Sequence, residues 1–417
     1  MTPVPLFSAD DLRPWAGVAQ GSAAPRVALI GVSGYAQVYL NLIRELLALR
    51  AVRLEAVVII NPDEERAVVA ELAARGTRIY ADYAVMLAAE KGRIELCFIP
   101  TGIPWHAPMT IDALQAGANV LVEKPLAGSL ADAAAIRSAE RATGHWVAVG
   151  FQDLYPPHAP WLKGQLLAGL VGRVRSVRFI GMWPRGTAYY ARNRWAGRLV
   201  AEGRAVLDSP LNNAFGHFVN LVLYFAGPTG GEAAQVDQLS ATLLRAHAIE
   251  SFDTAIVRGK TREGIEVVLA ATHASRTGHE PEIEIEGDLG RVRWAHEASC
   301  QIVLAGRPPR SFALPNAMDA RRFMLAHVLR KLRGEDPMIC DTAIAERHVA
   351  FIEAVHASTV VSTVPPSRLD WTPAQGDSSP VPCLLGIEGV LLEAFGHPGA
   401  PQASGKGIGS ALEQWLQ

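Results

Sequence analysis

Short runs of apolar residues alternate with helical patterns over the first third of the chain. The apolar runs cover residues 26–31, 53–60, 77–80, 94–100, 119–124 and 145–151. The helical patterns between them lie near residues 35–50, 63–75, 82–91, 105–117 and 129–143. This alternation predicts a doubly wound parallel sheet. Runs such as 56–60 and 96–99 are apolar at every position, as expected for parallel strands that helices cover on both faces.

The pattern changes after residue 151, where strands become more numerous. Strand-like runs cover residues 174–181, 235–246, 252–260, 264–273, 281–286, 290–296 and 301–306. Polar and apolar residues alternate in several of them, which is typical of an antiparallel sheet with one solvated face. Helical patterns lie at 158–169, 212–225, 316–333 and 342–362. Asp341 is placed to cap the last of these helices, and residues 364–383 are predicted to form a loop or linker.

These patterns predict two domains with a flanking segment at each end. At 417 residues the chain is longer than a domain with a single hydrophobic core usually is. The first domain is expected to be α/β, and the second to be α+β with a large open, mainly antiparallel sheet. The expected limits are an N-terminal extension at 1–24, the α/β domain at 25–150, the α+β domain at 151–363, and a tail with a linker and short helices at 364–417.

Composition and charge exclude several classes of partner. The chain is 49% hydrophobic and has a net charge of −2, so it lacks the basic surface that nucleic acids require. No apolar run reaches the roughly 18 residues of a membrane span, and the N-terminus lacks the features of a signal peptide. The four cysteines form no CxxC pair, and the histidines are too scattered for a zinc site. We therefore expect a soluble, cytoplasmic protein without a bound metal.

A glycine-rich turn follows the first apolar run and precedes the first helical pattern. In such a turn, backbone N–H groups and the positive end of the helix face a pyrophosphate. Gly31 suits the sharp turn, and Ala36 suits the close packing of helix on strand. Ser33, followed by Gly34, takes the place of the second glycine. Alone, the motif is more often an ordinary turn, but the strand before it and the helix after it favour a dinucleotide site.

Asn61 ends the second apolar run, where an acidic residue commonly binds the adenosine ribose. Its amide can hydrogen-bond the ribose and does not repel a 2′-phosphate, and Arg66 follows shortly after it. The choice between NAD and NADP therefore stays open. The plainer alternative is that Asn61 and Pro62 simply form a turn that caps the next helix, which is compatible with either cofactor.

Five segments carry a resemblance to a known family. They are the Gly31 turn and residues 100–106, 113–125, 149–153 and 216–220. Through them the chain resembles the glucose–fructose oxidoreductase/inositol dehydrogenase (Gfo/Idh/MocA) family, and the stretch 113–125, which ends in Glu-Lys-Pro, is the specific part. The resemblance implies a Rossmann domain that binds NAD or NADP. It also implies a second domain whose open sheet pairs copies into a homodimer or homotetramer, and the oxidation of a sugar or cyclitol hydroxyl.

The resemblance also implies roles for individual residues. It makes Lys124 and His217 the catalytic pair, with Asn213 in place of the usual aspartate and Leu154 in place of a common arginine. The residues expected at the cofactor are Gly31, Ser33, Gly34, Tyr35, Ala36, Asn61, Thr101, His106, Glu123 and Lys124. The residues expected at the substrate are Gln152, Tyr155, Arg192, Trp195, Asp208, Asn212, Asn213 and His217.

The chemistry of alcohol oxidation suits the lysine and the histidine. When a carbinol carbon loses a hydride, a positioned base must take the hydroxyl proton. Histidine titrates near neutral pH, and a lysine stabilises negative charge that develops on the same oxygen. Asn213 can only hydrogen-bond, so His217 is expected to be a weaker base than it would be beside an aspartate. A packed histidine and a solvated strand-end lysine are the plainer alternatives.

The segment 183–198 is dense in aromatic residues and arginines. This composition suits a polyhydroxylated ring or an acidic sugar, and it also suits a surface loop or a contact between subunits. Together these features predict an NAD(P)-dependent oxidoreductase that acts on a sugar, sugar acid or cyclitol. Two alternatives are a cofactor-binding regulator of the same fold with weak or no turnover, and an enzyme of redox-assisted glycoside cleavage.

Overall fold

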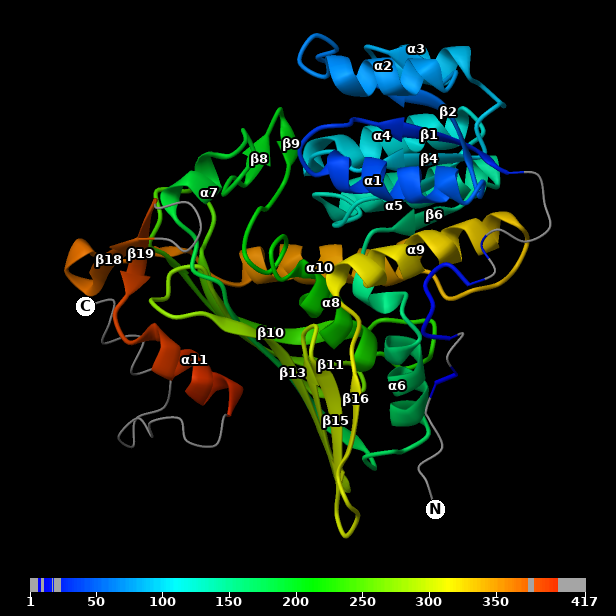
Figure 1. Cartoon of the computed structure of the whole chain (residues 1–417). Helices are drawn as coiled ribbons and strands as arrows, with labels where there is room; N and C mark the ends of the chain where they lie inside the picture. Colours follow the sequence, from blue (N-terminus) through cyan, green and yellow to red (C-terminus); the bar gives the residue numbers. More distant parts are fainter. Residues whose placement is uncertain (1–6, 9–10, 17, 19–23, 374–378, 397–417) are drawn as a thin grey trace. The chain divides into compact units, whose positions relative to one another are not determined.

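The computed structural model describes residues 7–8, 11–16, 18, 24–373 and 379–396 of the chain (Figure 1). Its backbone groups into two compact units. Unit 1 is drawn from residues 1–160 and 317–346, and unit 2 from residues 161–316 and 347–417. Each unit is built around its own β-sheet.

Unit 1 contains a six-stranded sheet in the order β3-β2-β1-β4-β5-β6, with every pairing parallel. The strands are β1 (Arg26–Ile30), β2 (Arg53–Val58), β3 (Arg78–Tyr80), β4 (Leu96–Ile99), β5 (Asn119–Val122) and β6 (Val147–Val149). The helices that follow them are α1 (Ala36–Ala48), α2 (Arg66–Ala74), α3 (Tyr83–Ala89), α4 (Ile103–Gln115) and α5 (Leu130–Thr143). The predicted doubly wound parallel sheet is confirmed. The strand order reverses between β1 and β4, and in such sheets ligands bind at the carboxyl ends of the strands beside this point.

Local sequence explains why these elements form. Leu29, Val57 and Phe98 are fully buried in neighbouring strands, so the sheet needs helices on both faces. Asp82 and Ser129 stand before α3 and α5, and each accepts a hydrogen bond from the backbone N–H three residues on, at 2.9 and 3.1 Å. A cap of this kind stabilises a helix by about 1 kcal/mol.

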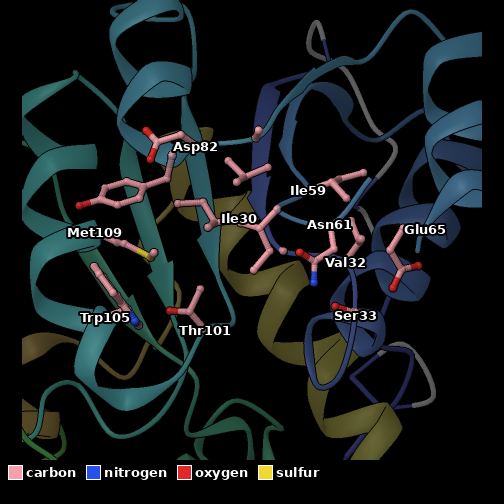
Figure 2. Close-up of a pocket in the computed structure, with 15 residues that line it drawn as sticks. Ile30, Val32, Ser33, Ile59, Asn61, Glu65, Asp82, Thr101, Trp105 and Met109 are labelled. Atoms are coloured by element: carbon pink, nitrogen blue, oxygen red, sulfur yellow. The ribbon is translucent and has the colours of Figure 1, made fainter. Parts of the chain in front are cut away.

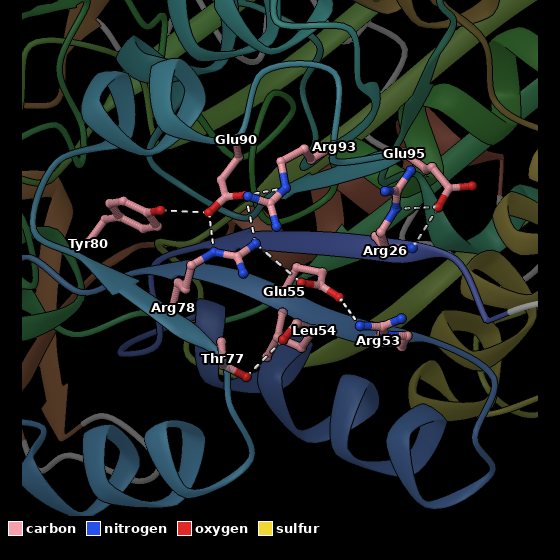
Figure 3. A network of polar contacts seen from close by, with 10 residues as sticks. All are labelled: Arg26, Arg53, Leu54, Glu55, Thr77, Arg78, Tyr80, Glu90, Arg93 and Glu95. Carbon is pink, nitrogen blue, oxygen red and sulfur yellow. Dashed lines mark hydrogen bonds and ion pairs between the residues drawn. The ribbon is translucent and has the colours of Figure 1, made fainter.

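Charged side chains pair at the sheet edge formed by β2 and β3 (Figure 3). Glu90 is buried and accepts hydrogen bonds from the Tyr80 hydroxyl at 2.6 Å and from Arg78 Nη2 at 2.7 Å. The hydrogen bond from the Arg78 guanidinium is the main reason that the pKa of Glu90 is lowered. Arg78 also pairs with Glu55 at 3.2 Å, and Glu55 with Arg53 at 2.7 Å. The network therefore fixes this edge of the sheet through mutually satisfied charges.

Residues 317–346 group with unit 1 although they follow the strands of unit 2 in sequence. α9 (Ala317–Leu332) packs against the 3₁₀ turn η1 (Gln152–Leu154), and its Arg322 pairs with Glu45 of α1 at 2.9 Å. The sequence pattern could not predict where this helix packs, because the pattern indicates which face of a helix is apolar but not which element covers that face. The domain boundaries expected at residues 150 and 363 stay a prediction, because this grouping into units does not test them.

Unit 2 contains a nine-stranded sheet in the order β16-β15-β14-β13-β7-β12-β11-β10-β17. The strands are β7 (Val174–Met182), β10 (Val236–Arg245), β11 (Thr254–Thr261), β12 (Glu266–Thr272), β13 (His279–Gly287), β14 (Gly290–Ala295), β15 (Ser299–Leu304), β16 (Arg310–Ala313) and β17 (Ser362–Thr363). Only the β7–β12 and β10–β17 pairings are parallel, so the prediction of a mainly antiparallel sheet is confirmed. Its helices include α7 (Thr187–Ala191) and α8 (Gly216–Phe225), together with most of α6 (His158–Leu167) and α10 (Thr342–Ser358). The short strands β8 (Val200–Ala201) and β9 (Arg204–Ala205) pair with each other.

The segment predicted as a loop or linker at 364–383 contains regular structure, so that prediction was wrong. β18 (Leu369–Pro373) pairs with β19 (Pro380–Leu384), and α11 (Ile387–Phe395) follows. Ile387, Leu391 and Phe395 of α11 pack with Ile180 and other apolar residues of the sheet (Figure 1). Prolines at the ends of both strands hide the hairpin, whose middle at 374–378 lies outside the described residues.

A buried lysine joins two helices of unit 2. Lys163 of α6 is fully buried, and its Nζ donates to the carbonyl oxygen of Tyr224 at 2.6 Å and also to that of Gly227. These carbonyls lie at the carboxyl end of α8, where helix carbonyls lack partners within the helix and the dipole favours a cation. Burial lowers the pKa of Lys163 to about 8. The ammonium therefore acts as an internal cap for α8.

Candidate functional site

The carboxyl end of β1 leads through a tight turn into α1. Gly31 has a φ of +97°, and a Cβ built there would meet the Cβ of Ala36 at 3.4 Å. The Gly31 N–H donates to the carbonyl oxygen of Val58 at 2.9 Å, which ties the turn to β2. Among the described residues, no side chain caps the amino end of α1. The turn thus combines a backbone that favours glycine with a helix terminus of the kind that binds phosphate.

A pocket of about 390 Å³ opens beside this turn within unit 1 (Figure 2). Its lining comes from the segments that follow β1, β2, β3 and β4 and from the first turns of α4. In Figure 2 the polar side chains of Ser33, Asn61 and Glu65 lie on one side, and Trp105 and Met109 lie on the other. The pocket therefore has a polar wall and an aromatic–apolar wall, which match the ribose and the base of an adenosine.

The lining also contains an unsatisfied hydroxyl group. Thr101 Oγ1 is buried and makes no hydrogen bond to any residue that the structure describes. Buried polar atoms in native proteins nearly always have a hydrogen-bond partner. A ligand with polar groups fits this part of the pocket, so the residues present suit a dinucleotide.

The structure brings together four of the residues predicted at the cofactor. Gly31, Ser33, Asn61 and Thr101 all line the pocket. Three others lie close in sequence but outside the lining. These are Gly34 and Tyr35 of the turn and Ala36, which begins α1.

His106 is also predicted at the cofactor, but it lies wholly in the interior of unit 1. Its Nδ1 is 2.6 Å from the carbonyl oxygen of Pro125, and its Nε2 is 3.1 Å from that of Thr101. Burial lowers the pKa of this imidazole. Both ring nitrogens already face backbone oxygens, and the expected contact with the cofactor stays a prediction. His106 holds together the segments that follow β4 and β5, and so positions Thr101.

Glu123 is likewise turned into the protein, with 4% of its surface exposed. Its carboxylate accepts a hydrogen bond from the Tyr39 hydroxyl at 2.8 Å and another from the Lys124 N–H at 3.0 Å. Burial raises the pKa of Glu123, while the charge of Lys124 and the Tyr39 hydrogen bond act in the opposite direction. A Cβ at Gly150 would stand 2.8 Å from this carboxylate, so glycine leaves room for it. Glu123 therefore positions Lys124 and does not line the pocket, and its expected contact with the cofactor stays a prediction.

Tyr39 and Arg321 were not foreseen in this network. Tyr39 is fully buried on α1, and Arg321 of α9 donates through Nε to the Tyr35 hydroxyl at 3.2 Å. The signal for Tyr39 was a hydroxyl-bearing aromatic residue on the apolar face of the first helix. No local signal exists for Arg321, because it reaches this network from 286 residues further along the chain.

In unit 2, the predicted catalytic residues flank the start of α8. The helix begins at Gly216, so Asn213 lies in the turn before it and His217 lies in its first turn. The helical pattern predicted from residue 212 thus becomes a regular helix only from Gly216. The Asn213 N–H donates to the carbonyl oxygen of Ser209 at 2.9 Å, which closes a turn instead. Both side chains are half-buried.

Three residues predicted at the substrate serve the interior of their own unit. The Tyr155 hydroxyl donates to the carbonyl oxygen of Val149 at 2.8 Å, and Asp208 accepts from the Gly197 N–H at 2.6 Å. The Asn212 amide donates to two backbone oxygens, and its oxygen lies 3.1 Å from His348 Nε2. All three side chains are buried, and their expected direct contact with substrate stays a prediction.

Gln152 of η1 is also buried, but its Oε1 has no hydrogen-bond partner among the described residues. The structure gives this side chain no interior role comparable with that of Tyr155. Its expected contact with substrate stays a prediction.

The arginine-rich segment forms an ordered stack. The Arg192 guanidinium lies 3.7 Å from the ring centre of Tyr189 and 5.5 Å from that of Trp195. The Arg185 guanidinium also lies near Tyr189, at 5.0 Å from its ring centre. The sequence indicated the composition, but it did not indicate that Arg185 and Arg192 share one tyrosine. Cation–π contacts of this kind hold a loop in a fixed shape.

Three further features concern metal sites, thiols and membranes. Within the described residues, no three His, Cys, Asp or Glu side chains gather in a way that could hold a metal ion. The four cysteines are buried free thiols. In the described part of the chain, no helix has the length and apolarity needed to cross a membrane.

Comparisons with known proteins agree with this geometry. Residues 25–151 match the family model GFO_IDH_MocA, which is described as an oxidoreductase family with an NAD-binding Rossmann fold. The chain is 26% identical to D-apiose dehydrogenase of Paraburkholderia graminis over 257 residues, which are 60% of this chain and 63% of that protein. It is 26% identical to inositol 2-dehydrogenase of Azotobacter vinelandii over 275 residues, which are 66% of this chain and 75% of that protein. The first match thus spans less than two thirds of its relative.

Solved structures share the fold. The WlbA dehydrogenase of Bordetella pertussis, solved with NADH and UDP-GlcNAcA, superposes with a TM-score of 0.65 at 24% identity, over 80% of this chain and 96% of its own. An inositol dehydrogenase homologue of Azotobacter vinelandii, solved with NAD+, gives a TM-score of 0.70 at 18% identity, over 81% of this chain and 95% of its own. At these identities the likeness establishes the fold.

Proposed function

We propose that this chain, whose residues 25–151 match the model of the Gfo/Idh/MocA oxidoreductase family with its NAD-binding Rossmann fold, is an NAD(P)-dependent dehydrogenase. Its substrate is a sugar, sugar acid or cyclitol, from which a hydride passes between a CH–OH carbon and the nicotinamide. The observation that carries the proposal is the pocket beside the Gly31 turn, with its polar and aromatic walls and its unsatisfied Thr101 hydroxyl. D-Apiose dehydrogenase and inositol 2-dehydrogenase, the relatives named above, support the class of substrate.

The cofactor, when bound, supplies the hydride acceptor. Lys124 donates a hydrogen bond to the reacting oxygen and stabilises the negative charge that develops on it. Glu123 supports Lys124 through the hydrogen bond to its N–H and through its charge. His217 takes the hydroxyl proton as general base, and Asn213 and Gln152 orient the substrate. The meeting of Lys124 with His217, which belong to different units, is part of this proposal.

Arg192 and Trp195 contribute to substrate binding in this proposal. Their stack with Tyr189 supports that role, because it presents planar donors and aromatic faces that suit a polyhydroxylated ring. Copies of the chain associate as a homodimer or homotetramer through the sheet of unit 2. The part of that sheet that α11 leaves uncovered carries paired charges such as Arg293 with Glu282, at 2.5 Å, which suit a polar interface. A cytoplasmic location stays a prediction.

The test is the absorbance of newly formed NADH or NADPH across a panel of sugars, sugar acids and cyclitols. Wild-type protein is expected to reduce the cofactor with at least one member of the panel. Lys124→Ala is expected to bind the cofactor but to lose at least about a hundredfold in turnover, as for removal of one charge-stabilising donor. Cofactor binding without reduction across the whole panel would instead favour a regulatory protein of the same fold.

A further inference from the structure

We propose that Glu65 makes the pocket selective for NAD(H) over NADP(H), an inference that rests on the proposed function and adds the residue that discriminates between the two cofactors. Position 61, where an acidic residue commonly makes this choice, is a neutral asparagine. Glu65 begins α2 as its N-cap residue and lines the pocket four positions later. The structure thus supplies a carboxylate from a different place in the chain.

The position of Glu65 on the pocket wall indicates which part of the cofactor it meets. The phosphates of a dinucleotide belong at the Gly31–Ser33 turn, beside the amino end of α1. The base belongs on the opposite wall, where Trp105 and Met109 lie (Figure 2). The ribose joins base to phosphate, so it must pass along the wall that holds Ser33, Asn61 and Glu65. Its 2′-position is the group that distinguishes the two cofactors.

The charged side chains that line the pocket are all acidic. Among the described residues that line the pocket, two are acidic and none is lysine or arginine. The second acid, Asp82, caps α3 through its Oδ1 at 2.9 Å, and in Figure 2 it lies on the wall opposite Glu65. Arg66 follows Glu65 directly but does not line the pocket. Its guanidinium is 82% exposed and lies 3.7 Å from Asp63.

This arrangement treats a hydroxyl and a phosphate in opposite ways. A 2′-hydroxyl can donate a hydrogen bond to the Glu65 carboxylate, and a charge-assisted bond of this kind is stronger than a neutral one. A 2′-phosphate has no proton to donate and carries close to two negative charges. With a separation of about 5 Å in a water-like dielectric, the repulsion weakens binding by roughly tenfold. No cation in the lining offsets it.

The experiment measures dissociation constants by calorimetry for two matched pairs of ligands. NADH against NADPH tests the whole cofactor, and AMP against adenosine 2′,5′-bisphosphate tests the adenosine half alone. The proteins are wild type, Glu65→Gln and Glu64→Gln. Glu64 carries the same charge one residue earlier, but it lies outside the lining and accepts from Asn61 Nδ2 at 3.4 Å. Glutamine at 64 keeps that acceptor.

Wild type is expected to bind NADH about tenfold or more tightly than NADPH. Glu65→Gln is expected to remove most of that gap, mainly by improving NADPH binding, and Glu64→Gln to remove much less. Equal binding of NADH and NADPH by wild type would overturn the inference and leave the proposed function standing. A gap that is unchanged in Glu65→Gln, or reduced equally by both variants, would also overturn it. Failure of folded wild type to bind any of the four ligands would refute the proposed function itself.

Discussion

The hydrogen bond from Tyr39 to Glu123 gives a quantitative prediction about Lys124. Tyr39→Phe removes one donor, at 2.8 Å, from a carboxylate that is almost fully buried. A hydrogen bond to a charged group contributes about 1.5–3 kcal/mol. At about 1.4 kcal/mol for each pH unit, the loss raises the pKa of Glu123 by a further 1–2 units or so, from a value that burial has already raised.

The consequence for activity follows from the sign of this change. Protonated Glu123 no longer offers a charge to Lys124, so activity falls at acidic pH in addition to the fall that protonation of the general base His217 causes. The acidic limb of the pH profile of kcat/KM is therefore expected to move upward by about 1–2 units in Tyr39→Phe. The measurement is that profile between pH 5 and pH 9, since kcat/KM reports groups of the free enzyme.

The matched control is Tyr35→Phe. Tyr35 precedes Tyr39 by one helical turn, but its hydroxyl accepts from Arg321. The control is expected to move the acidic limb much less than Tyr39→Phe does, because the Tyr35 hydroxyl makes no hydrogen bond to Glu123 and only holds Arg321, whose charge is a smaller influence on the pKa of Glu123. Equal shifts in the two variants, or no shift in Tyr39→Phe, would refute the reasoning that Glu123 acts through Lys124.

Three further predictions concern the scaffold. Gly31→Ala is expected to weaken NADH binding at least tenfold in calorimetry. The position has a φ of +97°, which an alanine adopts only with backbone strain of about 1–3 kcal/mol in the turn. Unchanged affinity would contradict this role. Lys163→Met is expected to destabilise the protein by about 3 kcal/mol at pH 7 in thermal unfolding, because carbonyls at the end of α8 lose their donor, whereas exposed Lys260→Met should change little. The pKa of Lys163 is lowered to about 8 in the folded protein. Between this pH and 10.5 the folded protein has lost the proton while the unfolded chain still holds it. The stability of wild type relative to Lys163→Met is therefore expected to rise over this pH range. Glu90→Gln is expected to cost more stability at pH 7 than at pH 3, because the pKa of Glu90 is lowered by Arg78 and the benefit of its charge disappears as pH falls through that value; an equal loss at both would count against it.

Much of the fold could be predicted because its signals are local. The six parallel strands of unit 1 are apolar at nearly every position, and the helices between them begin at recognisable caps such as Asp82 and Ser129. The glycine turn was located for the same reason, since one backbone angle at Gly31 requires glycine. The hairpin of β18 and β19 was missed, because its strands are short and contain prolines at their ends.

The candidate site could be predicted less completely, because a residue type does not tell where its side chain points. His106 and Glu123 lie in motifs that suggested contact with the cofactor, yet both side chains turn inward to hydrogen-bond partners. In the sequence, Glu65 is one of several acidic residues in a polar turn. The structure shows that Glu65 lines the pocket and that Glu64 does not. Tertiary placement of this kind has no signature in local spacing.

The most direct test of the central claim is an experimental structure of the protein with NADH bound. The account predicts that the adenosine occupies the pocket lined by Gly31, Asn61 and Thr101, and that Lys124 Nζ and the His217 ring both face the nicotinamide across a shared cavity. An adenosine bound elsewhere, or a Lys124 and a His217 that open into separate cavities, would contradict the account.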